Sequence, residues 1–162
     1  MKHTKTIQSQ TELNTPVKES FELVFNFDML ECFKNMPSMP HFDYVPVKSG
    51  KFRPGFHQTL YFANDAAARR RLVYFLPEIL FLVTTDCPVG AFWAGIHRID
   101  YQYYFVKNLD KERSTMLQWE YRFKFKSRFW LLLFNLFLRR RITDYLIVFH
   151  EQLREKCCAN TA

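Results

Sequence analysis

GIHRIDYQYYFVK, at residues 95–107, and LQWEYRFKFK, at residues 117–126, change the kind of side chain at every position. One face of these two segments is mainly aromatic and carries His97, Ile99, Tyr101, Tyr103 and Phe105, followed by Leu117, Trp119, Tyr121, Phe123 and Phe125. The other face carries mainly charged and amide side chains. Because successive side chains of a strand point to opposite faces, the pattern is typical of two antiparallel strands with one solvated face.

The aromatic face needs a cover, and the C-terminal residues have the longest helical pattern in the chain. We expect one helix from about Arg128 to Lys156. Its first part, Phe129 to Leu138, is apolar nearly all round, and apolar residues then recur at helical spacing at Ile142, Tyr145, Leu146, Phe149 and Leu153. Large aromatic side chains that face a single helix tend to leave a hollow. The pattern therefore predicts a ligand cavity between the sheet and the helix.

Five further segments have the alternation or the β-branched and aromatic content of strands, at Val17–Phe27, Phe42–Val47, Phe56–Ala63, Arg69–Leu76 and Glu78–Thr85. Asp28 is a suitable N-cap for a short helix that ends at Phe33. The predicted fold class is therefore α+β. It consists of a curved antiparallel sheet of about seven strands around the long C-terminal helix, with a short helical segment after the first strand.

A chain of 162 residues has the length of one ordinary domain. We expect a polar tail at residues 1–14, the domain at residues 15–157 and a short tail at residues 158–162. The cysteines lack the spacing of a metal site, and the N-terminal residues lack the apolar run of a signal peptide. We therefore expect reduced thiols and a cytoplasmic location.

This order of elements resembles the START/Bet v 1-like (SRPBCC) superfamily, which includes polyketide cyclase/dehydrase-like and lipid-transfer proteins. The resemblance extends over nearly the whole chain from residue 15, in the strand Val17–Phe27 with Asp28–Phe33, the junction Phe75–Leu80, the alternating pair that ends at Lys126, and the helix Leu138–Leu153. It implies a helix-grip fold, in which a deep apolar cavity lies between the sheet and the helix. A lipocalin-like barrel is the competing fold, but the early helical segment and the length of the last helix favour the helix-grip fold.

Seven residues are candidate ligand contacts: His97, Tyr101, Tyr103, Trp119, Tyr121, Phe123 and Arg70. His97 is predicted to face the cavity, where an imidazole is able to take a proton or to bind a ligand carbonyl. The alternative for His97 is a core histidine paired with a neighbour. In a strand, the side chain of Arg70 points to the face opposite those of Arg69 and Arg71. At least one guanidinium of the three is therefore expected to reach the cavity or its rim, where it is suited to bind a carboxylate. The alternative is that all three arginines are solvated.

The pattern predicts a protein that binds a hydrophobic small molecule or lipid in this cavity. The alternative is a cyclase- or dehydratase-like enzyme in which His97 is the acid/base. The sequence lacks the GxGxxG, P-loop, GxSxG and HExxH motifs, so we assign no catalytic residue and expect no cofactor. The five histidines lack the spacing of metal ligands, so we also expect no metal. The net charge of +7 favours anionic partners, but the aromatic residues are not interleaved with the basic ones as in nucleic-acid binders, so we expect no nucleic acid.

The apolar half of the C-terminal helix ends at three arginines. Its run of about ten residues is half of what a membrane-spanning helix needs. Trp130, Phe137, Arg139, Arg140 and Arg141 together are suited to a peripheral contact with an anionic membrane. The same apolar surface also fits a cavity mouth or a homodimer contact, and the arginines also fit a merely solvated turn, so the sequence leaves these alternatives open.

Overall fold

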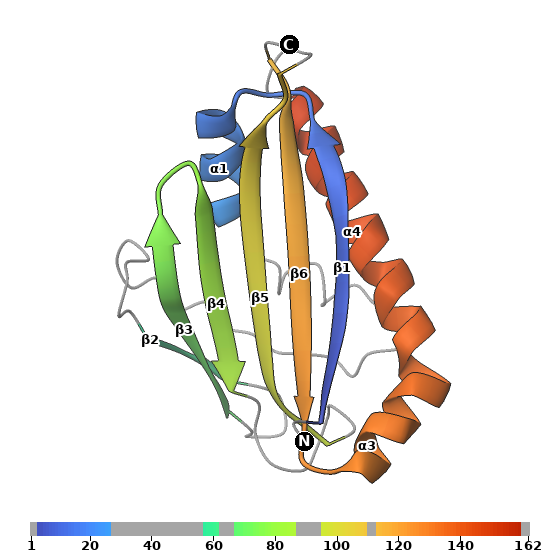
Figure 1. Cartoon of the computed structure of the whole chain (residues 1–162). Helices are drawn as coiled ribbons and strands as arrows, with labels where there is room; N and C mark the ends of the chain where they lie inside the picture. The colour runs from blue at the N-terminus through green and yellow to red at the C-terminus, as the bar shows by residue number, and fades with distance from the viewer. Residues whose placement is uncertain (1–2, 27–56, 62–66, 87–94, 110–112, 160–162) are drawn as a thin grey trace.

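The computed structural model describes residues 3–26, 57–61, 67–86, 95–109 and 113–159. Within these residues, six strands form one antiparallel sheet in the order β1-β6-β5-β4-β3-β2 (Figure 1). Their bounds are Thr4–Leu13 for β1, His57–Tyr61 for β2, Ala67–Leu76 for β3, Leu80–Asp86 for β4, Ile96–Lys107 for β5 and Thr115–Phe125 for β6. Strands β2 to β6 confirm five of the predicted strands. Consecutive strands from β2 to β6 are neighbours, which is a simple meander.

The first strand of the sheet is not the predicted one. The predicted strand Val17–Phe27 is wrong, because Val17–Asn26 is a helix, α1. The apolar residues of this segment fit both the two-residue period of a strand and, at Val17, Phe21 and Val24, the period of a helix. Pro16 favours the helix, because proline is common at helix starts, where its missing N–H would have no partner in any case.

The predicted tail at residues 1–14 contains the true first strand, β1, so this part of the predicted domain organisation is wrong. β1 is an edge strand that pairs with β6 along its whole length, from Thr4 opposite Lys124 to Leu13 opposite Thr115. Only Ile7 and Leu13 are buried hydrophobic residues in it. A strand with so few apolar residues shows almost no hydrophobic alternation in its sequence. Its backbone nevertheless forms the hydrogen bonds of an antiparallel pair with β6.

The C-terminal helix starts at the predicted residue but has three parts. They are α3 (Arg128–Leu133), a π-helical turn η1 (Phe134–Leu138) and α4 (Arg139–Ala159). The π turn is visible in the bond from the Arg139 N–H to the carbonyl of Phe134 five residues earlier. Helix α4 therefore continues beyond Lys156 into the predicted C-terminal tail.

Both α1 and α4 lie against one face of the sheet, which we call the inner face (Figure 1). The phenyl ring of Phe21 in α1 lies 5.0 Å from that of Phe105 and 5.5 Å from that of Phe75, measured between centroids. At the other end of the sheet, the ring of Phe134 packs on Phe123 and Phe125. Aromatic rings thus hold a helix to each end of the inner face and leave its middle to β5, β6 and α4.

Two predicted elements, the strand Phe42–Val47 and the short helix Asp28–Phe33, lie outside the described residues. The described part is an α+β arrangement with a helix after the first strand and a long C-terminal helix, as predicted. The first strand begins at Thr4 and not at Val17, and the first helix begins at Val17 and not at Asp28.

Candidate functional site

The middle of the inner face is an aromatic wall built from β5 and β6. Its members are five of the predicted ligand contacts, all buried: Tyr101, Tyr103, Trp119, Tyr121 and Phe123. The register places Tyr101 opposite Tyr121 and Tyr103 opposite Trp119, and the rings of Tyr101 and Tyr121 are stacked with centroids 5.7 Å apart. Their inward position is therefore correct, and their contact with a ligand stays a prediction.

Two hydroxyl groups meet inside the wall. The Tyr103 and Tyr121 hydroxyls form a short hydrogen bond within the buried cluster. Burial, reinforced by Tyr103, raises the pKa of Tyr121 well above its ordinary value of 10.0. Tyr121 therefore keeps its proton at neutral pH and supplies a neutral hydrogen-bonding group.

Helix α4 adds a residue to this wall that the sequence analysis did not single out. His150 is buried and its imidazole lies parallel to the indole of Trp119, with ring centroids 4.1 Å apart. The same imidazole is 5.8 Å from Tyr103 and 6.2 Å from Tyr121, again between centroids. The sequence does contain an indication that His150 is buried. The helical spacing of Leu146, Phe149 and Leu153 places His150 at the edge of the buried side of the helix.

The two ring nitrogens of His150 have different surroundings. Nδ1 lies 2.5 Å from the carbonyl oxygen of Leu146, and a carbonyl accepts, so Nδ1 carries the hydrogen. Burial lowers the pKa of His150 from 6.5 to about 3, and the ring is therefore neutral at physiological pH. Nε2 is then a bare acceptor, and within the described part of the chain this buried atom has no hydrogen-bond partner.

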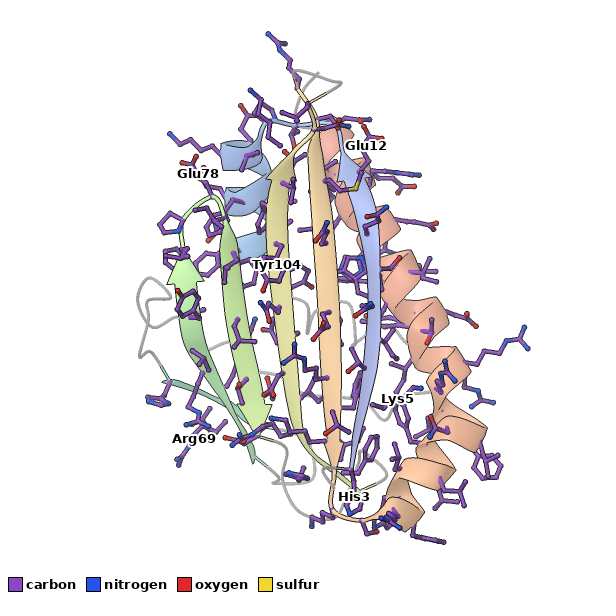
Figure 2. The ribbon with its side chains drawn as sticks, viewed as in Figure 1. His3, Lys5, Glu12, Arg69, Glu78 and Tyr104 are labelled. Carbon is purple, nitrogen blue, oxygen red and sulfur yellow. The ribbon has the colours of Figure 1, made fainter. Side chains whose placement is uncertain are left out.

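Arg70 approaches the wall from β3. Its guanidinium carbon lies 5.6 Å from the centroid of the Tyr101 ring. Its neighbours turn the other way: Arg71 binds Asp86 at 3.0 Å, and Arg69 extends away from the sheet (Figure 2). The alternation predicted for the three arginines is thus correct, whereas the binding of a ligand carboxylate by Arg70 remains a prediction.

The inward position predicted for His97 is wrong, because its side chain is exposed. Ile96 pairs with Phe125 and Arg98 with Lys124, so His97 is an extra residue in β5 with no partner opposite it. Such a bulge reverses the alternation beyond it, and Ile96 takes the buried position instead. An enzyme that uses His97 as the acid/base inside the cavity is therefore ruled out by position.

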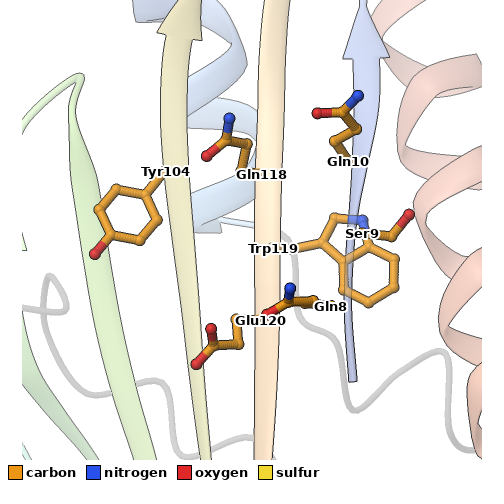
Figure 3. A pocket seen from close by; sticks show the side chains of 7 residues that line it. All are labelled: Gln8, Ser9, Gln10, Tyr104, Gln118, Trp119 and Glu120. Atoms are coloured by element: carbon orange, nitrogen blue, oxygen red, sulfur yellow. The ribbon is translucent and has the colours of Figure 1, made fainter. Parts of the chain in front are cut away.

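The outer face of the sheet carries a pocket of about 360 Å³ (Figure 3). Its lining comes from β1, β5 and β6 and consists of Gln8, Ser9, Gln10, Tyr104, Gln118, Trp119 and Glu120. Most of these side chains are amides or a carboxylate that already face solvent. This pocket lies mainly on the face opposite the predicted cavity, so it is not the cavity between the sheet and the helix that the sequence predicts.

The inner-face arrangement is suited to binding. Its polar groups include the hydroxyls of the wall tyrosines and a neutral imidazole, which are fixed by packing among aromatic rings. Among the described residues, no group of three or more His, Cys, Asp and Glu side chains is placed to hold a metal ion. A histidine with a pKa near 3 is a weak base at neutral pH, and this favours hydrogen bonding over proton transfer.

No family model matches the chain, and no curated protein does. Solved structures do match. A norcoclaurine synthase from Thalictrum flavum, in complex with dopamine and hydroxybenzaldehyde, is 12% identical, with a TM-score of 0.60 over 96% of this chain and 87% of that one. A protein from Arthrobacter aurescens is 12% identical, with a TM-score of 0.61 over 95% and 86%. Ara h 8.0201 is 10% identical, with a TM-score of 0.52 over 77% and 80%.

The chain has the Bet v 1-like helix-grip fold. The resemblance seen in the sequence is thereby confirmed, even though two of the segments that suggested it, Val17–Phe27 and Asp28–Phe33, are a helix and a segment outside the described residues. At such low identity the match establishes the Bet v 1-like fold alone. Among the described helices, none has the length and hydropathy that crossing a membrane requires.

Proposed function

We propose that this Bet v 1-like chain binds a hydrophobic small molecule or lipid between the aromatic wall of β5 and β6 and helix α4. The observation that carries the proposal is the buried Nε2 of His150, which has no hydrogen-bond partner in the described part of the chain. Buried polar atoms are nearly always paired, because an unpaired one costs about 1–3 kcal/mol. A ligand with a hydroxyl or N–H group next to an apolar body would supply the missing partner.

The rest of the wall supports a neutral, flat ligand. The rings of Tyr101, Tyr103 and Trp119 offer apolar surfaces, and the hydroxyl pair adds a second polar contact near His150. Arg70 places a positive charge at the border of the wall, 5.6 Å from the centroid of the Tyr101 ring. The norcoclaurine synthase with the same fold holds two aromatic small molecules, dopamine and hydroxybenzaldehyde.

Mass spectrometry of the purified protein tests the proposal, first under native conditions and then after organic extraction. A small molecule in stoichiometric amount, with an aromatic or lipid skeleton and a hydroxyl or N–H group, is the expected result. A matched pair of ligands gives a second test when nothing co-purifies. Naphthol should bind about fivefold more tightly than naphthalene, because a neutral hydrogen bond contributes about 1 kcal/mol.

Two histidine variants make this second test specific. His150→Leu removes the acceptor and should abolish the preference for naphthol, whereas His97→Leu changes an exposed histidine and should retain it. Titration calorimetry measures both ligands with each variant, and circular dichroism checks that each variant is folded. Binding of neither ligand, or an unchanged preference in His150→Leu, would contradict the proposed site.

A further inference from the structure

One side of the first part of the C-terminal helix, α3 and η1, is an exposed apolar surface. Its members are Phe129, Leu132, Leu136 and Phe137, with exposed fractions of 61%, 56%, 65% and 67%. They stand at offsets of 0, 3, 7 and 8 residues, which is the spacing of one helix face. We call these four residues the apolar ridge. Single exposed apolar residues are common, but four on one face mark an interaction surface.

The ridge faces outward because other aromatic residues hold the opposite side of the helix. Phe134 is fully buried against Phe123 and Phe125, and Trp130 lies directly on the backbone of Gly95. The helix is therefore fixed to the sheet by its inner side. Turning the ridge inward would expose Phe134 in its place and would break the contact of Trp130 with Gly95, so rotation of the helix cannot hide the apolar surface.

Positive charges bracket the ridge at both ends. Between residues 126 and 141 the chain has five basic residues and no acidic one: Lys126, Arg128, Arg139, Arg140 and Arg141. All five are exposed. The Arg140 side chain is 95% exposed and lies 4.0 Å from the carboxylate of Asp144, one turn along the helix. The arginines that follow the ridge therefore face solvent, where they are able to meet an external anion.

We propose that the apolar ridge and its five flanking cations form a docking surface for an anionic lipid bilayer. The helix lies in the plane of the membrane: the ridge enters the boundary between headgroups and acyl chains, and the arginines contact lipid phosphates. The apolar run is too short to cross a bilayer, and no described helix is able to do so. This inference does not depend on the ligand site at His150, which lies further along the chain in α4.

Charge selects the bilayer over a second copy of the chain. In a two-fold dimer the same surface meets itself, so that the ridge of one copy would lie along the ridge of the other. Both ends of the ridge are basic, and either a parallel or an antiparallel pairing therefore places cations against cations. Anionic lipids have the complementary charge together with an apolar interior.

Co-sedimentation with lipid vesicles tests the docking surface. The full chain should bind vesicles of phosphatidylcholine mixed with phosphatidylserine, and should bind pure phosphatidylcholine vesicles at least about tenfold more weakly, since each basic residue near an anionic surface contributes roughly a fivefold factor. Changing Arg139, Arg140 and Arg141 to Gln should remove most of this difference. Leu136→Ser with Phe137→Ser should weaken binding to the mixed vesicles about tenfold or more.

Matched variants separate the surface from general charge and hydrophobicity. Changing Lys107, Arg113 and Arg154 to Gln removes the same net charge from exposed positions elsewhere, and Leu109→Ser removes an apolar side chain that is 91% exposed. Both controls should bind the mixed vesicles nearly as the parent chain does. Equal binding to both kinds of vesicle, or equal loss in the controls, would overturn the proposal. So would a dimer in size-exclusion chromatography that dissociates on Leu136→Ser, because the ridge would then bind a second copy.

Discussion

The imidazole of His150 and the indole of Trp119 are parallel to within 6°, with ring centroids 4.1 Å apart. This pair joins the C-terminal helix to the strand at the centre of the aromatic wall. It also fixes the direction of the imidazole, since one ring nitrogen is held by the Leu146 carbonyl and the ring plane by Trp119. A neutral acceptor is thereby held inside an aromatic environment.

The buried imidazole makes the stability of the fold depend on pH. Because the pKa of His150 is about 3 in the folded chain and 6.5 in the unfolded chain, the unfolded chain takes up a proton first as the pH falls. The free energy of unfolding should therefore decrease between pH 6.5 and about 3, with a slope of up to about 1.4 kcal/mol per pH unit from this residue. Urea denaturation followed by circular dichroism at several pH values in this window measures the slope.

A histidine pair provides the control for this pH dependence. His150→Gln removes the titrating group from the buried site and should flatten the slope, whereas His97→Gln changes an exposed histidine and should leave it unchanged. The comparison uses slopes and not absolute stabilities, since His150→Gln also changes packing against Trp119. The same slope in both variants would show that His150 titrates normally.

The hydroxyl pair of Tyr103 and Tyr121 should contribute measurably to stability. Tyr103→Phe removes one partner of a buried hydrogen bond and should lower the free energy of unfolding by about 1–2 kcal/mol. Tyr104→Phe, one residue along β5 on the exposed face, should change it by less than about 0.5 kcal/mol. In the double variant Tyr103→Phe, Tyr121→Phe the loss should be smaller than the sum of the two single losses. An additive double variant would indicate that the two hydroxyls do not interact.

The sequence predicted the aromatic wall well because its strands are long and their two faces differ strongly. From Ile99 to Phe105 and from Leu117 to Phe125 the inward residues are those that the alternation indicates. The failure at His97 has a physical cause, since an extra residue in a strand reverses the alternation and no local signal marks it. The alternation of side chains therefore predicts which residues point inward only in parts of a strand that contain no bulge.

The miss at β1 follows from a feature that the strand itself does not contain. β1 is held by its backbone pairing with β6, so its side chains need little apolar character. The helical spacing of α4 indicates that His150 is buried, but its contact with Trp119, 31 positions earlier in the chain, comes from the packing of two distant segments. Contacts between distant segments decide such positions, whereas periodicity reports only the local environment.

The packing of α1 tests its assignment as a helix. Phe21 is buried among Phe75, Phe81 and Phe105, so Phe21→Ala should lower the free energy of unfolding by about 3–5 kcal/mol. Phe129→Ala removes a ring of the same size from an exposed helical position and should cost less than about 0.5 kcal/mol. Thermal or urea unfolding measures both variants. Similar losses in the two variants would mean that α1 does not pack on the sheet as described.

The contact between Gly95 and Trp130 sets the position of the apolar ridge. Gly95 has φ of 73°, and a Cβ built there would lie 2.1 Å from Cγ of Trp130. Gly95→Ala should therefore cost about 2–5 kcal/mol, part of it backbone strain and part of it collision with the indole. In a Trp130→Ala background the collision is gone, and the cost of Gly95→Ala should fall to the backbone part, about 1–2 kcal/mol. Urea denaturation of the four chains in this double-mutant cycle measures the difference, and a cost that does not depend on residue 130 would mean that the indole does not lie on Gly95.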